Sequence, residues 1–402
     1  MSQAVSMPAI THMPDDHPMR KLPMIGGVVG GVGLLAAVGL AFTGESKDFF
    51  FSYTVAYLYF LSIALGSLFF VIIHHASSAG WSVVVRRIAE NAMYTLPAMA
   101  VLFIPVAVGY HDLWHHWVDP EVVANDPVLQ GKQAYLNVPF FFGRAVLYFA
   151  LWSLLAWFFR GNSVAQDESG DPALTTKMRM RSYPSIAVFA LTISFAAIDW
   201  IMSMDPHWFS TMWGVYFFSG SALSMFSFLA LVGLLMRRAG LLGDAISIEH
   251  YHDIGKYMFG FVVFWTYIAF SQFMLIWYAN LPEETIWFEH RMEGSWLTIS
   301  YVLIACHFVI PFFYTLPRTI KRIPNLLLCG AIWILVLHYV DLYWMIMPIH
   351  HHHGPHFGLL DVACMVGIGG LFVAVFSHWM GKSAMIPVKD PFLQESLSFE
   401  NF

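Results

Sequence analysis

The sequence predicts an all-α, polytopic integral membrane protein with ten transmembrane helices. Three observations predict this class: the composition, the spacing of the apolar runs and the placement of the basic residues. Of the 402 residues, 58% are hydrophobic, 17% aromatic and only 11% charged, whereas soluble domains carry about 25% charged residues. This composition excludes an ordinary water-soluble domain, and we expect no nucleic-acid partner.

Ten apolar runs approach the roughly 20 residues that a helix needs to cross the hydrocarbon core. The first run follows Arg20 and Lys21 and has no clear small-residue cleavage site after it, so we expect it to remain as the first helix. The predicted helices cover residues 24–43, 53–76, 92–110, 139–159, 183–204, 212–236, 257–281, 295–317, 325–347 and 359–381.

Lysine and arginine predict the orientation, because cytoplasmic connections carry an excess of them. One side has only Lys47, Lys132 and Arg291, and Arg144 falls inside the fourth helix. We therefore expect both termini in the cytoplasm, with tails at 1–22 and 382–402 around a membrane domain at 23–381, and a polar cytoplasmic loop at 160–182. The basic residues of the predicted cytoplasmic side are Arg20, Lys21, Arg86, Arg87, Arg160, Lys177, Arg179, Arg181, Arg237, Arg238, Lys256, Arg318, Lys321, Arg322, Lys382 and Lys389.

Two pairs of similar segments indicate an internal repeat. Residues 59–69 (YFLSIALGSLF) resemble 216–226 (YFFSGSALSMF), and Asp199 precedes Pro206 by the same spacing as Asp341 precedes Pro348. Both matches fall four helices apart, so the repeat is parallel. The sequence predicts two tandem four-helix bundles, helices 2–5 at about 53–204 and helices 6–9 at about 212–347, flanked by helices 1 and 10.

Ionisable side chains inside apolar helices are the main candidates for function. His338 and Asp341 are three residues apart and share one helix face. A charge inside a bilayer is costly and seldom faces lipid, so this face is expected to look into a bundle or a wet cavity. The alternative is that such residues only join helices by hydrogen bonds. The candidates for a proton path or a quinone site are Asp199, Asp205, His207, Gln272, His307, His338 and Asp341.

Four kinds of chemistry compete for the histidines. A metal site in the run His350 to His353 with His356 is disfavoured, because consecutive histidines point in different directions and no acidic or Cys partner has ligand spacing. A b-type haem would have only His307 and His338 as an axial pair. The three cysteines form no CxxC or CxxCH motif, so we expect no metal, haem or iron–sulfur cofactor in this chain.

Quinone chemistry and proton conduction remain. Oxidising a quinol requires a His or carboxylate within hydrogen-bond reach of its hydroxyl, for which His338 with Asp341, or Asp199 with Asp205 and His207, are candidates. A proton path without quinone would run from Glu90 and His74 or His75 through Gln272 and His307 to His338, Asp341 and Asp199.

Histidine and tryptophan are dense in the connections of the predicted periplasmic side. Tryptophan at helix ends is typical of the membrane interface, but this density also suits docking of another protein. The histidine candidates for docking are His111, His115, His116, His350, His351, His352, His353 and His356.

The segments AIDWIMSMDPHWFSTMWG (197–214) and HYVDLYWMIMPIHHHHGPHFGLLD (338–361), with ten helices and a duplicated core, resemble the NrfD/polysulfide-reductase family of quinone-interacting membrane subunits. Within that family the chain is most similar to membrane subunits of bacterial alternative complex III, a quinol:cytochrome c oxidoreductase. The resemblance implies the bacterial inner membrane, and menaquinol or ubiquinol as electron donor. It also implies a paralogous ten-helix membrane subunit, a periplasmic iron–sulfur subunit, multihaem c-type cytochrome subunits, small membrane subunits and lipid as partners.

The resemblance places the working quinol site more readily in the sister subunit, with this chain supplying a second site, a scaffold or a proton path. No quinone-ligand motif carries over residue by residue. Two other functions stay open: a purely structural membrane anchor, and a stand-alone secondary transporter, since parallel repeats with midplane polar groups also occur in transporters.

Overall fold

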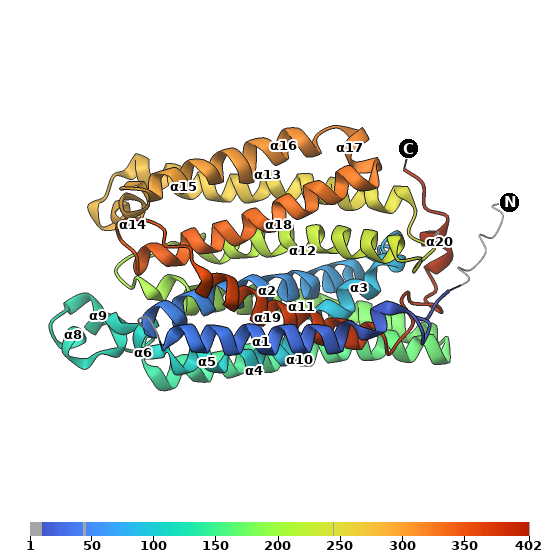
Figure 1. Cartoon of the computed structure of the whole chain (residues 1–402), viewed down its shortest axis with the longest axis horizontal. Coiled ribbons are helices and arrows are strands. Elements are labelled where there is room, and N and C mark those ends of the chain that lie inside the picture. The colour runs from blue at the N-terminus through green and yellow to red at the C-terminus, as the bar shows by residue number, and fades with distance from the viewer. Residues whose placement is uncertain (1–9, 43–45, 244, 402) are drawn as a thin grey trace.

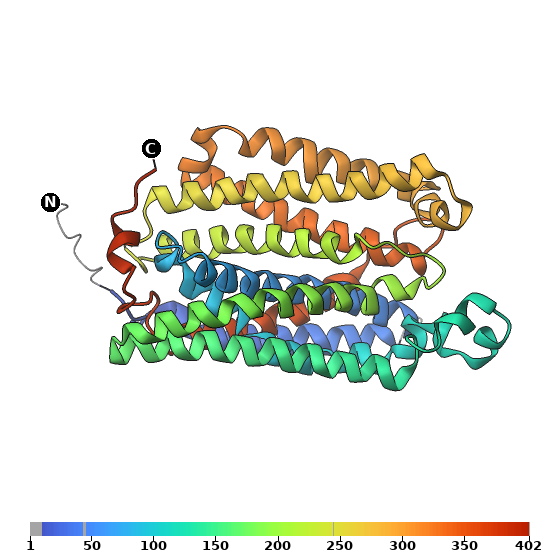
Figure 2. The same cartoon turned by 180° about the vertical axis from the view of Figure 1, so that it is seen from behind.

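The structure is a computed structural model that describes residues 10–42, 46–243 and 245–401. The regular secondary structure of these residues is entirely helical, without a strand (Figure 1 and Figure 2). Ten segments of the described chain are long and apolar enough to cross a membrane, which confirms the predicted class. They are Pro18–Ala41, Ser46–Ala76, Val83–Val108, Val138–Ser169, Pro172–Met204, Trp213–Arg238, Ile248–Ala279, Trp296–Thr315, Pro324–Ile349 and Leu359–Met380.

Several of these segments are built from more than one helical element. The long elements are α1 (Leu22–Ala41), α2 (Ser46–Ala76), α3 (Val83–Met93), α10 (Val138–Ser169), α11 (Pro172–Trp200), α12 (Trp213–Arg238), α13 (Ile248–Ala279), α14 (Pro282–Met292), α18 (Pro324–Ile346) and α19 (Leu359–Met380). The short ones are η1 (Pro18–Lys21), α4 (Leu96–Leu102), α5 (Ile104–Val108), α6 (Tyr110–Leu113), α7 (His115–Val118), α8 (Pro120–Ala124), α9 (Pro127–Lys132), η2 (Met202–Met204), α15 (Trp296–Val302), the π-helical η3 (Leu303–Val309), α16 (Ile310–Thr315), α17 (Arg318–Arg322), η4 (Met347–Ile349) and α20 (Leu393–Leu397).

The predicted polar loop at 160–182 is wrong. Both α10 and α11 continue beyond the apolar stretch, and the chain reverses at Gly170 and Asp171. Gly170 has a φ of +67°, a conformation that suits glycine, and the Asp171 carboxylate accepts a hydrogen bond from the Ala173 amide to cap α11. Local capping residues therefore end these helices, whereas the prediction ended them where the hydrophobicity falls.

Helices α2 and α12 lie at the centre of the molecule. Helix α2 packs against α3, α11, α12, α18 and α19, and α12 packs against α11, α13 and α18 as well as α2. The two helices approach closely at Gly66, where a Cβ atom would come within 2.2 Å of the Ser221 carbonyl oxygen. The division into two bundles related by duplication stays a prediction.

Helix α1 packs mainly on α19 along a line of glycines. A Cβ atom on Gly30 would lie 2.7 Å from the Leu371 amide nitrogen, and one on Gly370 would lie 2.4 Å from the Gly30 nitrogen. Small residues at such an interface allow two helix backbones to approach closely. The opposite side of α1 is exposed, with Val28 and Leu35 among its outward residues.

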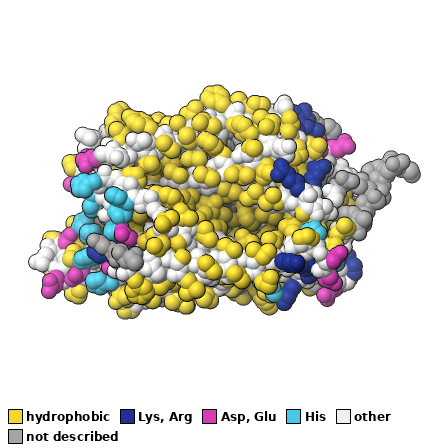
Figure 3. Space-filling view, viewed as in Figure 1, with side chains coloured by type: hydrophobic (Ala, Val, Ile, Leu, Met, Phe, Trp, Pro, Cys, Tyr) yellow, Lys and Arg dark blue, Asp and Glu magenta, His cyan; other side chains and the backbone are white. Residues whose placement is uncertain are grey.

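Both ends of the described chain lie at the same end of the molecule (Figure 1). Figure 3 shows a broad hydrophobic band between that end, where lysine and arginine gather, and the opposite end, where histidine gathers. The charge asymmetry read from the sequence is therefore an asymmetry of the folded molecule.

Several residues predicted to lie in loops of the basic end are buried inside helices instead. Arg86 and Arg87 in α3 are 3% and 0% exposed. Arg86 contacts Glu90 and Asp390 at 3.0 and 2.5 Å, and Arg87 contacts Glu90 and Asp167 at 3.0 and 2.7 Å. The third spanning segment therefore begins at Val83, ahead of the predicted residue 92, because these arginines meet carboxylates within the fold.

The predicted C-terminal tail packs on the membrane helices. Asp390 holds it to α3, and Met385 and Leu393 are buried. The Met385 amide also donates to the Thr11 carbonyl of the N-terminal segment. Residues 1–9 of the predicted N-terminal tail, and Phe402, lie outside the described residues.

Candidate functional site

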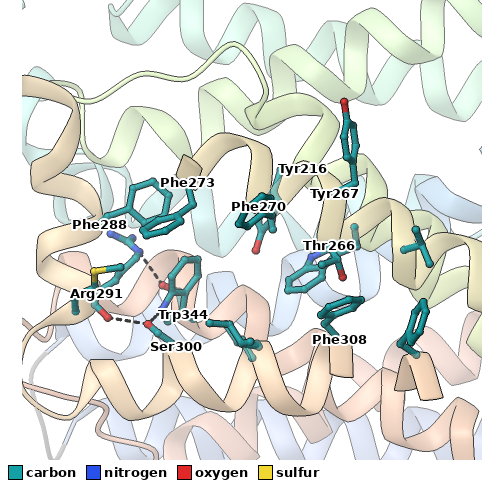
Figure 4. A pocket seen from close by; sticks show the side chains of 17 residues that line it. Tyr216, Thr266, Tyr267, Phe270, Phe273, Phe288, Arg291, Ser300, Phe308 and Trp344 are labelled. Atoms are coloured by element: carbon teal, nitrogen blue, oxygen red, sulfur yellow. Dashed lines mark hydrogen bonds between the residues drawn. The ribbon is translucent and has the colours of Figure 1, made fainter. Parts of the chain in front are cut away.

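A cavity of about 650 Å³ lies between α13 and the segment that contains α14, α15, η3 and α16 (Figure 4). Its volume is within the range of small-molecule sites, and its lining is mostly aromatic and aliphatic. Phe270 and Ile304, which border it, are 59% and 58% exposed. The cavity therefore opens sideways, on the apolar surface that a bilayer would cover.

Two aromatic side chains of the cavity wall hold a buried carboxyl group. The Tyr216 hydroxyl donates to Asp341 Oδ1 at 2.5 Å, and Trp265 Nε1 donates to Asp341 Oδ2 at 3.0 Å. Asp341 is 1% exposed, and among the described residues no cation lies within salt-bridge distance of it. One hydroxyl and one indole N–H therefore separate the cavity from a carboxyl group that can gain or lose a proton without breaking an ion pair.

His338 lies beside Asp341, as their spacing predicts. Its Nε2 is 2.8 Å from the Ser62 hydroxyl, whose own proton is donated to the Tyr59 carbonyl oxygen. Ser62 can therefore only accept from His338, which assigns the proton to Nε2 and leaves Nδ1 as an acceptor. A Cβ atom on Gly220 would be 3.2 Å from that Nδ1 and 3.9 Å from Asp341 Oδ2, so glycine keeps the space between the two groups open.

His307 belongs to the same region through Trp265. Its ring lies 4.3 Å from the Trp265 ring, edge to face, and the side chain is 1% exposed. Neither ring nitrogen has a hydrogen-bond partner among the described residues. His307 is placed by η3, a single π-helical stretch of a kind that is frequent at functional sites.

Arg291 stands at the end of the cavity that is nearest the histidine-rich end of the molecule. It donates to the carbonyl oxygens of Trp344 and Met345, in the last turn of α18, and stacks on the Trp287 ring with its guanidinium carbon 3.4 Å from the ring centre. Burial lowers the pKa of Arg291 to about 9, which leaves it cationic at neutral pH. Figure 4 shows Arg291, Ser300 and Trp344 linked by hydrogen bonds at this end.

Asp199, the counterpart of Asp341 in the predicted repeat, has a different environment. Arg144 contacts it through Nε at 2.8 Å and Nη2 at 2.9 Å, and the hydroxyls of Tyr135 and Tyr148 each donate to it at 2.8 Å. Asp199 is 0% exposed. Its charge is balanced and every carboxylate lone-pair direction is used, so Asp199 joins α10 to α11 as a structural element.

The other predicted site residues do not join one cluster among the described residues. His207 pairs with Asp126 at 2.5 Å rather than with Asp199, and its hydrogen bond holds the pKa of Asp126 below its usual value. Gln272 accepts a hydrogen bond from Ser210. Asp205 lies near enough to Arg291 that its negative charge offsets part of the lowering of the Arg291 pKa by burial.

The predicted entry to a proton path at the basic end stays a prediction. Glu90 is bound by two arginines, and His74 Nδ1 is 2.7 Å from the Phe70 carbonyl oxygen. His75 stacks on Phe159. Glu90 therefore belongs to an ion-pair network that links α3 to α10 through Asp167 and to the C-terminal segment through Asp390.

The histidines form a nearly continuous group at the other end. The rings of His111, His115, His116 and His207 follow one another at 5.8, 6.1 and 6.3 Å between centres. Burial lowers the pKa of His116, and the nearby His115, His207 and His352 add to this effect. His352, His353 and His356 are exposed, whereas His350 and His351 are partly buried against Asp48 at the start of α2.

Sequence reasoning missed four residues of this architecture: Tyr216, Trp265, Arg144 and Arg291. Arg144 carried a usable signal, because an arginine inside an apolar helix requires a carboxylate partner. Tyr216 stood in the repeated segment but was interpreted only as part of the repeat. Trp265 is one of many aromatic residues inside the predicted helices, and Arg291 was interpreted as a residue of a connection, so neither carried a signal of its own.

No family model and no curated protein sequence matches this chain. Function is therefore inferred from the side chains and their geometry.

Proposed function

We propose that this chain is an integral subunit of a respiratory quinol-oxidising complex in a bacterial inner membrane, comparable to the ActF subunit of alternative complex III. Its contribution is a quinone-facing cavity between α13 and α16 with a proton acceptor, Asp341, behind the cavity wall. One observation carries the proposal: an apolar cavity open toward lipid, with Tyr216 and Trp265 both lining it and bound to Asp341.

The lining fits a ring with an apolar tail. Quinones reach their sites from the lipid phase, so a lateral opening framed by Phe270 and Ile304 suits their entry. A quinol bound in the cavity would supply two electrons and two protons. The Tyr216 hydroxyl is both donor and acceptor, so it can take a proton from the cavity side as it gives its own to Asp341.

The residues next to Asp341 extend this route. Gly220 leaves Asp341 Oδ2 and His338 Nδ1 facing a shared space, and His338 Nε2 continues to Ser62. Arg291 fixes the last turn of α18, and with it the position of Asp341 five residues before Ile346.

The histidine-rich end of the molecule, called the histidine face below, supports the docking of the expected partner subunits. If the basic end is cytoplasmic, this face is periplasmic, where the iron–sulfur and multihaem c-type cytochrome subunits of such a complex would dock. A paralogous ten-helix subunit, small membrane subunits and lipid would cover the hydrophobic band. Exposed His352, His353 and His356 are the residues best placed for contact with a periplasmic partner.

A purely structural anchor is the second candidate, and the closed Asp199–Arg144 pair favours it for the first half of the chain. Under that function the cavity would hold only lipid.

Two experiments test the proposal. Purification of the chain from its native membrane, followed by mass spectrometry, should recover iron–sulfur and multihaem subunits with a paralogous membrane subunit; recovery of the chain alone would contradict it. In the assembled complex, Ala269→Phe fills the cavity and should slow quinol oxidation. Leu275→Phe, on the exposed side of the same helix, is the matched control and should leave the rate unchanged.

A further inference from the structure

The loop after α18 brings two histidines to a carboxylate from the other half of the chain. Asp48 stands in the first turn of α2, and its Oδ1 is 2.6 Å from His350 Nε2 and 3.5 Å from His351 Nε2. One donor atom from each of these three residues lies within 4.8 Å of the others. This supplies the acidic partner that local sequence spacing did not reveal.

Packing fixes the histidine rings in this orientation. The His350 ring stacks on Phe51 with ring centres 4.8 Å apart and planes 18° from parallel. The amides of His350 and His351 both donate to the Met347 carbonyl, which ends the helix in a tight turn. Consecutive histidines normally point apart, but this turn directs both Nε2 atoms toward the same carboxylate oxygen.

The donor set and its spacing fit a transition-metal ion. Two imidazole nitrogens and one carboxylate oxygen are common ligands of Zn²⁺, and tetrahedral bonds of about 2.0–2.1 Å place ligand atoms roughly 3.3–3.4 Å apart. The contact between His351 and Asp48, at 3.5 Å, is close to this length. The shorter contact between His350 and Asp48 is a hydrogen bond that an ion would replace, with release of its proton.

The surroundings give an ion access and further ligands. A cavity of about 450 Å³ is bordered by Asp48, His351 and His356, and the rings of His351 and His356 are 4.7 Å apart. Water or His356 can complete the coordination from this side.

We propose that Asp48, His350 and His351 form a binding site for a divalent transition-metal ion of the Zn²⁺ type. The ion joins the start of α2 to the loop that follows α18, and so fixes the exposed part of the histidine run. The site is separate from the quinone-facing cavity, and its test does not depend on quinol oxidation.

The experiment measures Zn²⁺ binding to the full chain, purified with its native partners, stripped with a chelator and titrated with Zn²⁺. The expected result is one equivalent of tightly held zinc that depends on Asp48 and His351. Asp48→Asn and His351→Gln should each weaken binding at least about tenfold, the lower bound for losing a supporting group around a metal. His353→Gln, exposed and outside the three-donor set, is the matched control and should bind as the unmodified protein does.

Two results would overturn the proposal: an unmodified protein that retains no zinc, or binding that Asp48→Asn and His351→Gln leave unchanged, which would put the ion elsewhere on the histidine face. Should the variants not assemble, zinc-edge X-ray absorption of the unmodified complex decides the question. Imidazole ligands together with oxygen ligands support the site, and a shell of oxygen alone or with sulfur contradicts it.

Discussion

Exchanging Asp341 and Asp199 for asparagine, one at a time, should separate function from stability. Each substitution replaces a fully buried carboxyl group by an amide of the same shape, at corresponding positions of the two segments that form the predicted repeat. The surroundings differ: Asp341 meets only a hydroxyl and an indole N–H, while Asp199 meets the Arg144 guanidinium. The same chemical change should therefore have opposite consequences at the two sites.

The expected magnitudes follow from the hydrogen-bond partners. In Asp341→Asn the amide oxygen can accept from Trp265, and the amide N–H₂ can donate to the Tyr216 hydroxyl if that hydroxyl rotates. The loss of stability should then be about 1 kcal/mol, the net value of a single hydrogen bond. In Asp199→Asn the guanidinium of Arg144 loses its countercharge, and breaking a buried ion pair costs about 3–5 kcal/mol.

Activity should show the reverse order. An asparagine at position 341 cannot accept a proton, and a positioned acid or base contributes about 10²–10⁴ to a rate. Quinol oxidation by assembled complex that carries Asp341→Asn should therefore fall by about 100-fold or more, while complex with Asp199→Asn should lose activity only in proportion to the protein that fails to assemble.

The assay combines denaturant titration in mixed micelles with turnover per assembled complex. Equal destabilisation by the two variants would refute the contrast between a charge-balanced and an unbalanced carboxyl group. Full turnover in assembled Asp341→Asn complex would remove Asp341 from the mechanism.

Three further predictions concern the stability of the fold outside the candidate site. Gly66→Ala should lower the free energy of unfolding by about 1–3 kcal/mol, because its Cβ would clash with Ser221. Gly143→Ala is the control and should cause no such loss, because its Cβ would meet no atom within 4 Å. Thermal unfolding in detergent compares the two variants. The hydrogen bond from His207 holds the pKa of Asp126 below its ordinary value of 3.8, so the ionised carboxylate stabilises the α8–α9 segment above about pH 4 and loses that effect as the pH falls through the lowered pKa. Hydrogen exchange of residues 119–132, corrected for intrinsic rates, should therefore rise only below about pH 4. Unchanged exchange below that pH would contradict the pairing. Asp390→Asn should release the C-terminal segment from Arg86 and increase exchange at residues 384–397, whereas Glu400→Gln, at an exposed position, should have no effect.

The sequence predicted the ten helices well, because apolar length is a local property of the chain. It misplaced the helix ends at Val83 and around Gly170, since the arginines of α3 are neutralised by distant carboxylates and the polar ends of α10 and α11 continue as helix beyond the apolar stretch. Hydrophobicity alone cannot report either effect.

The candidate site was predicted in part. Spacing along one helix correctly placed His338 beside Asp341, but it could not distinguish Asp341 from Asp199. That distinction depends on Arg144, which is 55 residues away from Asp199 in the chain. The contact between Asp48 and His350 spans 302 residues, so no local pattern could indicate it.

The central claim, that quinone occupies the cavity beside Asp341, is tested most directly by photoaffinity labelling of the purified native complex with a photoreactive quinone analogue. The account predicts labelled peptides from α13 and from α15 to α16, around Phe270 and Ile304, with labelling that unmodified quinol prevents. Labelling confined to partner subunits would contradict it.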